Sequence, residues 1–220
     1  MRIIVTAGPT REHLDPVRFL SNPSTGKMGF AIAAEAARRG HEVTLVAGPV
    51  ALKTPKGVER VDVVSAREML AEVEGALSAP AAENGGGTVL IATAAVADWR
   101  PAKCAAQKLK KGEMSGVLKL VRNPDILKTI AKARGRKTGD LRLVGFAAET
   151  NDVLKEAARK CREKGLEFIV ANDVTRRGCG FGTDTNRVTF VFPDGTLKRF
   201  PLMTKRMVAK RILEEIENEK

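Results

Sequence analysis

The stretch Arg2-Ile3-Ile4-Val5-Thr6-Ala7-Gly8-Pro9 is a β-branched apolar run that ends in a Gly-Pro pair. A run of this kind, bounded by a turn signal, predicts a buried first strand followed by a turn. A long polar loop follows, and the alanine-rich stretch at 28–39 then has helical character, with Gly40 where a C-terminal cap belongs. The sequence therefore predicts a strand, a loop and a helix in succession.

Strand-like and helical segments alternate over most of the remaining chain. Ser65 and Glu68 form a capping box, and Asn123-Pro124 predicts an N-cap and a first-turn proline. Further strands are predicted at 41–46, 61–64, 88–92, 117–121, 141–146 and 168–171, and further helices at 65–77, 123–134 and 151–164. This alternation predicts a three-layer α/β/α, Rossmann-like, doubly wound fold with a mainly parallel sheet.

The last part of the chain has a different pattern. Residues 186–192 and 196–200 flank Pro193-Asp194-Gly195, which predicts an antiparallel hairpin extension, and 204–219 is an amphipathic helix. Residues 78–87 are rich in Ala, Pro, Asn and Gly and predict a mobile surface loop. With 220 residues and 43% hydrophobic residues, we expect a single domain over residues 1–220.

Composition restricts the partners. The formal net charge of +12 predicts an anionic partner, and the excess is concentrated at 100–137, which leaves a nucleic-acid-binding protein open as an alternative. Aromatic residues are 4% of the chain, with no tyrosine, so stacking platforms for single-stranded nucleic acid are scarce. No apolar run is long enough for a membrane span, and three scattered cysteines predict reduced thiols. We expect a cytoplasmic protein without membrane partners.

Two common nucleotide motifs fail in the loop after the first strand. The Walker A pattern requires glycine and Ser or Thr where this chain has Ser21 and Met28. The dinucleotide fingerprint requires a glycine where Ser24 stands, and some twenty residues separate the strand from the helix. An NAD(P)-dependent reductase or epimerase is therefore disfavoured, although it remains a second alternative.

The loop from Gly8 to Gly29 nevertheless predicts an anion-binding site. Long loops in compact domains commonly bind something, and this loop follows the first strand of an open α/β sheet, where such sheets bind ligands. The helix N-terminus at its end favours anions. The other interpretation is a loop whose Ser and Asn side chains cap its own turns.

Short motifs along nearly the whole chain resemble one family, phosphopantothenate-cysteine ligase, the ligase half of the bifunctional coenzyme A biosynthesis protein. In order they are Thr6–Thr10, Arg18–Asn22, Gly26–Gly29, Ala94–Pro101, Lys108–Lys111, Asn123–Leu127, Gly145–Thr150 and Ala171–Val174. Pro23-Ser24-Thr25 departs from the more uniform serine pair expected before the glycine, and the flavin decarboxylase half is missing.

The resemblance implies a reaction in two halves. The carboxylate of 4'-phosphopantothenate attacks the α-phosphate of CTP to give an acyl-cytidylate and pyrophosphate, and the amine of L-cysteine then displaces CMP. No protein nucleophile is needed, because the site brings anions together and neutralises charge. Mg²⁺ is implied as a cofactor held mainly by substrate oxygens. The Ser-Asn and Gly-Lys-Met-Gly residues of the motifs follow the bacterial type of the family, which implies CTP rather than ATP.

The resemblance also assigns residues. Asn22 is similar to the asparagine that acts on the acyl-nucleotide, Lys108 to the lysine that neutralises the triphosphate, and Arg18 is placed to grip a phosphate or carboxylate. The expected nucleotide contacts are Gly8, Pro9, Thr10, Ala92, Thr93, Ala94, Ala95, Asp98, Lys108, Pro124, Asp125, Ile126, Leu127, Phe146, Lys160 and Lys164. No metal ligand is assigned, and the role of Lys27 stays open between ligand binding and loop structure.

The implied partners are small molecules, with a phosphopantothenoylcysteine decarboxylase as a fused or separate partner and no nucleic acid. Family members are dimers, and the hairpin near Asp194-Gly195 is one place where strands could pair between subunits.

Overall fold

The computed structural model describes residues 1–79, 86–113, 116–137, 141–149, 152–175 and 178–218. Most of the loop predicted as mobile at 78–87 lies outside these residues. Within them, no helix is both long and apolar enough to cross a membrane.

Eight strands form the main sheet, in the order β13-β12-β10-β9-β6-β1-β4-β5. In that order they span Leu197–Arg199, Val188–Val191, Phe168–Asp173, Leu141–Glu149, Thr88–Ala92, Arg2–Ala7, Glu42–Ala47 and Glu59–Asp62. The strands from β10 to β5 in this order pair in parallel, whereas β12 and β13 pair antiparallel at one edge. The predicted hairpin therefore extends the main sheet, as expected from Pro193-Asp194-Gly195.

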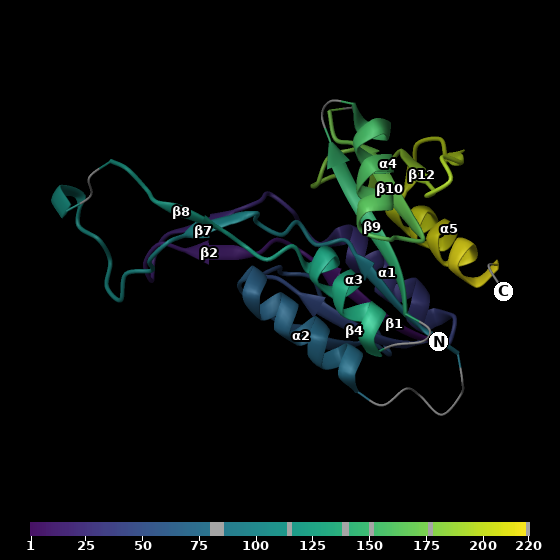
Figure 1. The fold of residues 1–220 in the computed structure, drawn as a ribbon, viewed down its shortest axis with the longest axis horizontal. Helices are drawn as coiled ribbons and strands as arrows, with labels where there is room; N and C mark the ends of the chain where they lie inside the picture. The colour runs from purple at the N-terminus through teal and green to yellow at the C-terminus, as the bar shows by residue number, and fades with distance from the viewer. Residues whose placement is uncertain (80–85, 114–115, 138–140, 150–151, 176–177, 219–220) are drawn as a thin grey trace.

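Helices cover both faces of this sheet (Figure 1). One hydrophobic core packs α1 (Lys27–Arg38) and α5 (Lys205–Asn218) on one face. The other core packs α2 (Ala66–Ser78), α3 (Ile126–Lys137) and α4 (Val153–Glu163) on the opposite face. The central strand β1 is buried along its whole length because helices lie on both sides of it. The predicted three-layer doubly wound fold is confirmed.

Local signals explain most helix ends. The capping box at α2 is confirmed, since the Ser65 side chain accepts from the Glu68 N–H and Glu68 Oε2 accepts from the Val64 N–H at 2.8 Å. The predicted N-cap at Asn123 is wrong. Asp125 Oδ1 accepts from the Lys128 N–H at 3.0 Å, whereas the Asn123 side chain donates to the Ala97 carbonyl at 2.8 Å. Helix α3 therefore begins later than predicted.

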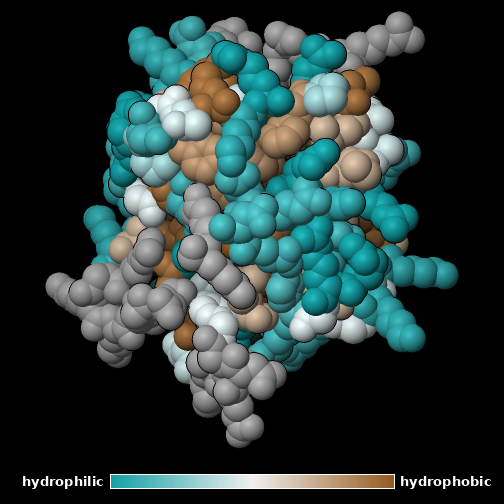
Figure 2. Space-filling model, turned by 90° about the vertical axis from the view of Figure 1, so that its right-hand side faces the viewer, coloured by the Kyte–Doolittle hydropathy of each residue, from teal (hydrophilic) through white to brown (hydrophobic). Residues whose placement is uncertain are grey.

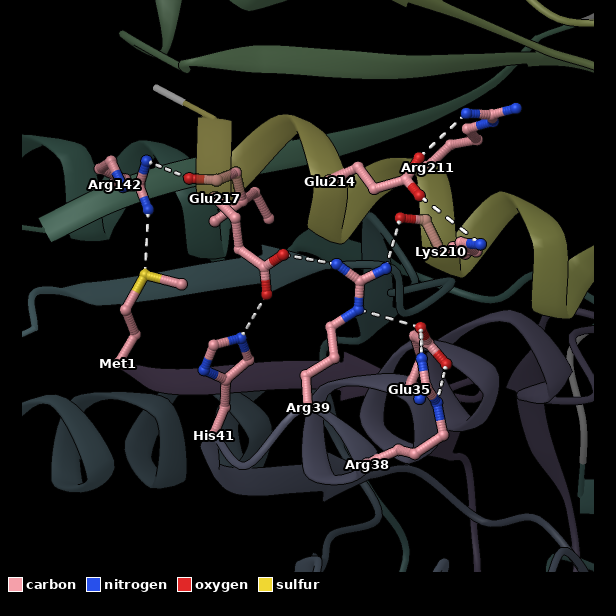
Figure 3. Close-up of polar contacts among 11 residues, drawn as sticks. Met1, Glu35, Arg38, Arg39, His41, Arg142, Lys210, Arg211, Glu214 and Glu217 are labelled. Atoms are coloured by element: carbon pink, nitrogen blue, oxygen red, sulfur yellow. Dashed lines mark hydrogen bonds and ion pairs between the residues drawn. The ribbon is translucent and has the colours of Figure 1, made fainter. Parts of the chain in front are cut away.

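A network of charged side chains ties α1 to α5 (Figure 3). Arg39 donates to both Glu35 and Glu217, and the ring of His41 lies 2.9 Å from Glu217. Glu35 is 5% exposed, and hydrogen bonds from the Arg38 side chain, then from Arg39, lower its pKa to about 2 against the opposing effect of burial. The closing helix is thus held by buried apolar residues and by this ionised network.

An arm projects from the sheet (Figure 1). It contains the antiparallel pairs β2 (Arg11–His13) with β3 (Phe19–Ser21) and β7 (Trp99–Pro101) with β8 (Leu120–Arg122), and a short 3-10 helix at Lys111–Glu113. The predicted polar loop at 8–29 therefore contains a hairpin, and the strand predicted at 117–121 is shorter and shifted. A small pair of β11 (Thr185–Asn186) with β14 (Met203–Thr204) lies before α5.

Candidate functional site

The site is built where the strand order reverses. After β1 the chain continues to β4 and β5 on one side, while β6 lies on the other side of β1, so the strand order reverses between β1 and β6. Open α/β sheets bind ligands in a crevice outside the carboxyl ends of the strands at such a point. Gly8 and Pro9 follow β1, and the N–H of Ala95 donates to the Gly8 carbonyl at 2.9 Å. Gly8 adopts φ +77°, which favours glycine. Two glycine- and alanine-rich segments thus approach each other at this edge.

Asn22 reaches the same edge from the end of β3. Its Nδ2 donates to the Ala95 carbonyl at 3.0 Å, and the side chain is half-buried. One amide hydrogen is used in this bond, so the second hydrogen remains for a ligand in the crevice. The structure therefore brings Asn22 together with Gly8, Pro9 and Ala95.

Thr10 lies behind this edge. It is 0% exposed, its Oγ1 accepts from the Ala97 N–H at 3.0 Å, and its carbonyl accepts from Ser21 Oγ at 2.7 Å. Its hydroxyl has no open approach, so Thr10 shapes the loop rather than facing a ligand.

A pocket opens beside the edge, on the α1 and α5 face. It is lined by Ser24–Gly29, Thr93, Phe146–Ala148, Asn172, Gly180, Phe181, Asn186 and Lys205. Helix α1 begins here at Lys27, directly after the N-cap residue Gly26, which adopts φ +77°, and its first turn contains no acidic residue. The first N–H groups of a helix have no intrahelical partners, so this end of the pocket attracts an anion. Of the expected contacts, Thr93 and Phe146 lie in this pocket.

Close packing sets the position of that helix start. A Cβ on Gly29 would lie 2.5 Å from both the Ala7 Cβ and the Thr93 Oγ1. Only glycine permits this approach, since carbon atoms in contact are normally about 3.5–4.0 Å apart. The hydroxyl of Thr93 is itself fixed by a 2.6 Å hydrogen bond to the Thr6 carbonyl. Helix α1 therefore starts directly on the ends of β1 and β6.

The other end of the pocket contains two buried acceptors without partners. Asn172 and Asn186 are 8% and 4% exposed, and the Oδ1 atom of each has no hydrogen-bond partner among the described residues. The Asn172 amide is oriented by a 2.9 Å bond from its Nδ2 to the Cys179 carbonyl. A buried acceptor without a partner is costly, so both atoms favour a ligand that donates hydrogen bonds. Neither was among the predicted site residues.

A loop at 178–184 forms the wall beside these asparagines. Lys205 is buried and its Nζ donates to the carbonyls of Phe181 and Thr183 at 3.1 and 2.6 Å. Lys27 donates to the Gly182 carbonyl at 3.0 Å and pairs with Asp184 at 2.7 Å. Lys27 therefore holds this loop, and it also lines the pocket. Lys205 was missed because a lysine at the start of a helix carries no sequence signal for burial.

A second group of expected contacts lies on the opposite face of the sheet. Ala92 and Ala94 pack against the core of α2, α3 and α4, as do Ile126 and Leu127, whereas Phe146 packs against the other core. Lys164 pairs with Asp125 at 2.8 Å. Lys160 lies on α4, which ends just before Lys164. Asp98 is exposed at the base of the arm, where its carbonyl accepts from the Asn123 N–H. The expected contacts therefore divide between two faces and approach one another only near the carboxyl edge.

Arg18 and Lys108 lie on the arm. The Arg18 guanidinium donates through Nε to Asp15 Oδ2 at 3.0 Å and through Nη2 to the Leu109 carbonyl at 3.0 Å. Lys108 is exposed on the neighbouring loop. Within the described residues, Arg18 forms an ion pair with Asp15, and it lies in the turn beyond the His13–Phe19 end of the hairpin. The structure groups these two cations with each other rather than with Asn22.

Comparisons with known proteins match nearly the whole chain. The family model for the DNA/pantothenate metabolism flavoprotein C-terminal domain matches residues 1–219. The chain is 47% identical over 219 residues to the coenzyme A biosynthesis bifunctional protein CoaBC of Escherichia coli K12, covering 98% of this chain and 51% of that protein. For CoaBC of Bacillus subtilis the identity is 46% over 215 residues, with 97% and 50% covered.

Solved structures give the same result. The crystal structure of the C-terminal domain of CoaBC is similar with 43% identity and a TM-score of 0.79, covering 98% of this chain and 93% of that one. The chain spans about half the length of the curated relatives it matches. The family inferred from the sequence motifs is confirmed: the chain belongs to the DNA/pantothenate metabolism flavoprotein C-terminal domain family.

Proposed function

We propose that this chain ligates 4'-phosphopantothenate to L-cysteine with CTP, through an acyl-cytidylate intermediate, and releases CMP and pyrophosphate. One observation carries the proposal: the pocket beside the switch point combines the start of α1 with two buried acceptors, at Asn172 and Asn186, that have no hydrogen-bond partner among the described residues. A nucleotide matches both features: its phosphates bind at a helix N-terminus, and its ribose hydroxyls or amino group can donate hydrogen bonds to the two asparagine oxygens. The CoaBC relatives are named for coenzyme A biosynthesis.

In the first half-reaction a carboxylate oxygen of phosphopantothenate attacks the α-phosphorus of CTP. The bond from that phosphorus to its bridging oxygen breaks, and pyrophosphate leaves. In the second half-reaction the cysteine amine attacks the acyl carbon, the bond from that carbon to the nucleotide oxygen breaks, and the amine loses a proton as CMP leaves. The protein's contribution is orientation and charge neutralisation, without a covalent protein intermediate.

The described residues take distinct parts in this scheme. The second amide hydrogen of Asn22 donates to the acyl carbonyl of the intermediate, where charge develops. The N–H groups at the start of α1 receive phosphate oxygens, and Lys108 neutralises the triphosphate from the arm. A nucleotide that crosses the carboxyl edge would also meet Asp98 and the start of α3 with Lys164.

Mg²⁺ is the proposed second cofactor, bound to the phosphate oxygens of CTP. Among the described residues no group of three or more His, Cys, Asp or Glu side chains could hold a metal ion. The proposal assigns no protein ligand to the ion, which would bind to the oxygens of the triphosphate. Residues 1–220 act as one ligase domain, and a decarboxylase is the expected fused or separate partner.

We also propose a homodimer that forms through the arm. Several large apolar side chains there are exposed, including Phe19, Trp99 and Val117, the last of them 82% exposed. By contrast, the turn of the β12–β13 hairpin presents Asp194, Gly195 and Thr196. The surface opposite the arm is mostly hydrophilic (Figure 2). Exposed apolar patches mark interaction sites, so the arm is favoured over the hairpin near Asp194.

The test is pyrophosphate release with each of the four nucleoside triphosphates and Mg²⁺. We expect release from CTP only when phosphopantothenate is present, and amide product only when cysteine is added. Asn22→Asp should accumulate the acyl-nucleotide, because a carboxylate offers no hydrogen to the polarised carbonyl. Absence of turnover with every nucleotide would refute the proposal, and salt-dependent DNA binding in its place would favour the nucleic-acid alternative.

A further inference from the structure

The turn between β2 and β3 contains a carboxylate that is completely buried. Asp15 is 0% exposed, and its Oδ1 accepts from the N–H groups of Val17 and Arg18 at 2.9 and 2.8 Å. Its Oδ2 accepts from Nε and Nη2 of the Arg18 guanidinium. These bonds, first of all those from the Arg18 side chain, hold the pKa of Asp15 well below its usual range despite burial.

The same carboxylate also holds the loop that carries Lys108. The Leu109 N–H donates to Asp15 Oδ2 at 3.2 Å, and the Leu109 carbonyl accepts from Arg18 Nη2 at 3.0 Å. Four residues earlier, the Ala105 N–H donates to the Leu14 carbonyl at 2.8 Å. Asp15 and Arg18 therefore hydrogen-bond to the N–H and the carbonyl of Leu109, the residue directly after Lys108.

We propose that Asp15 is a positioning residue that, together with its partner Arg18, fixes the loop of Lys108 for the activation half-reaction. The chemical consequence rests on the proposed function, whereas the positioning itself does not. A lysine on a long loop samples many orientations, and ordering it during the reaction costs conformational entropy. When its backbone is already fixed, the reaction step no longer carries this cost. Lys108 then approaches the triphosphate from a fixed loop, while Arg18 stays paired with Asp15.

The proposal separates the two half-reactions. Charge on the triphosphate matters while pyrophosphate leaves, whereas the later attack of cysteine on the acyl carbon takes place after the pyrophosphate has gone. Loss of Asp15 should therefore slow the first half-reaction and spare the second. A role limited to stability would lower both rates equally.

The experiment compares Asp15→Asn with Asp62→Asn in the full chain. Asp62 is also paired with an arginine, Arg60 at 2.6 Å, but it lies on the edge strand β5 of the main sheet and not in the turn between β2 and β3. An asparagine at position 15 has only one acceptor oxygen, because its second terminal atom is an NH₂ donor. It therefore cannot accept the N–H groups that both carboxylate oxygens of Asp15 accept. We expect Asp15→Asn to speed hydrogen exchange at 105–109 by at least about tenfold, with no change in Asp62→Asn.

The rates supply the second readout. Pyrophosphate release by Asp15→Asn should fall by about tenfold or more, while conversion of added acyl-cytidylate with cysteine stays within about twofold of wild type. Unchanged exchange, unchanged pyrophosphate release, or an equal fall in both half-reactions would each overturn the proposal. If wild type releases no pyrophosphate, the proposed function fails, and the exchange result still decides the positioning.

A second variant protects the test against misfolding of Asp15→Asn. Leu109→Pro removes the loop's N–H donor to Asp15 and leaves the buried pair of Asp15 with Arg18 in place. The same faster exchange and the same loss in the first half-reaction are expected. Wild-type values for both in Leu109→Pro would contradict the proposal.

Discussion

Replacing Gly29 with alanine tests whether the start of α1 is placed by direct contact with β1 and β6. The added Cβ would lie 2.5 Å from the Ala7 Cβ and from the Thr93 Oγ1. Neither neighbour can move away cheaply, because Ala7 belongs to the buried central strand and the Thr93 hydroxyl is held by the Thr6 carbonyl at 2.6 Å. Relief therefore requires a shift of α1 by about 1 Å, since carbon contacts are normally about 3.5–4.0 Å.

Two opposing terms set the change in stability. Overpacking of this kind costs roughly 1–3 kcal/mol. Alanine in place of glycine within a helix returns at most about 1 kcal/mol. We expect the free energy of unfolding of Gly29→Ala to fall by about 1–2 kcal/mol, and turnover to fall by about 100-fold, because a displacement of about 1 Å misplaces the phosphate-binding N–H groups.

The matched control is Gly75→Ala in α2, where an added Cβ meets nothing within 4 Å. It should raise the free energy of unfolding by about 0.5–1 kcal/mol and leave turnover unchanged. Urea unfolding and the pyrophosphate assay measure both quantities. If Gly29→Ala is as stable and as active as wild type, the helix start is not fixed by this contact and the reasoning is wrong.

Three further predictions concern the network, the thiols and the arm. Because the pKa of Glu35 is lowered from 4.5 to about 2, its ionised carboxylate stabilises the fold above pH 4.5, and this stabilisation is lost as the pH falls toward 2. Between pH 4.5 and 2 the free energy of unfolding of Glu35→Gln should therefore fall less than that of wild type in acid titrations. Burial raises the pKa of Cys161 to about 11, so a thiol reagent at pH 8 should modify exposed Cys104 rapidly and Cys161 only after unfolding; equal rates would contradict the buried placement. Trp99→Glu should convert a dimer to a monomer in sedimentation experiments, whereas Leu202→Glu near the hairpin should not, and the reverse result would move the interface to the hairpin.

The layers of the fold follow from local patterns that agree with one another. The first strand, the capping box at Ser65 and the turn at Asp194-Gly195 each specify a short stretch without reference to distant residues. The arm was less visible because Arg11–His13 and Phe19–Ser21 are short and mostly polar, so their pairing depends on the opposing strand rather than on hydrophobic alternation.

Part of the site depends on contacts that no single segment specifies. Asn22 could be inferred from its motif, and its side chain donates to the Ala95 carbonyl at the carboxyl edge of the sheet. Asn186 and Lys205 come from elements far apart in sequence and meet only because β11 and α5 close the pocket. For Lys164, helical spacing gives the neighbour on its own helix, but the face of the sheet on which that helix packs comes from the topology.

The buried carboxylate of Asp15 shows the same limit. In sequence it reads as a turn residue before proline, and its bond to Leu109 spans 94 positions. Only the folded arm shows that one side chain joins two loops.

The central claim is that the carboxylate of phosphopantothenate is activated by transfer to the α-phosphorus of CTP. Phosphopantothenate labelled with ¹⁸O in its carboxylate tests this directly when CMP, pyrophosphate and inorganic phosphate are analysed by mass spectrometry after one turnover. We predict one ¹⁸O atom in CMP and none in pyrophosphate, because the attacking oxygen stays on the α-phosphorus when the cysteine amine displaces the nucleotide. Label in inorganic phosphate, with CDP as the nucleotide product, would show attack at the γ-phosphorus and contradict the account.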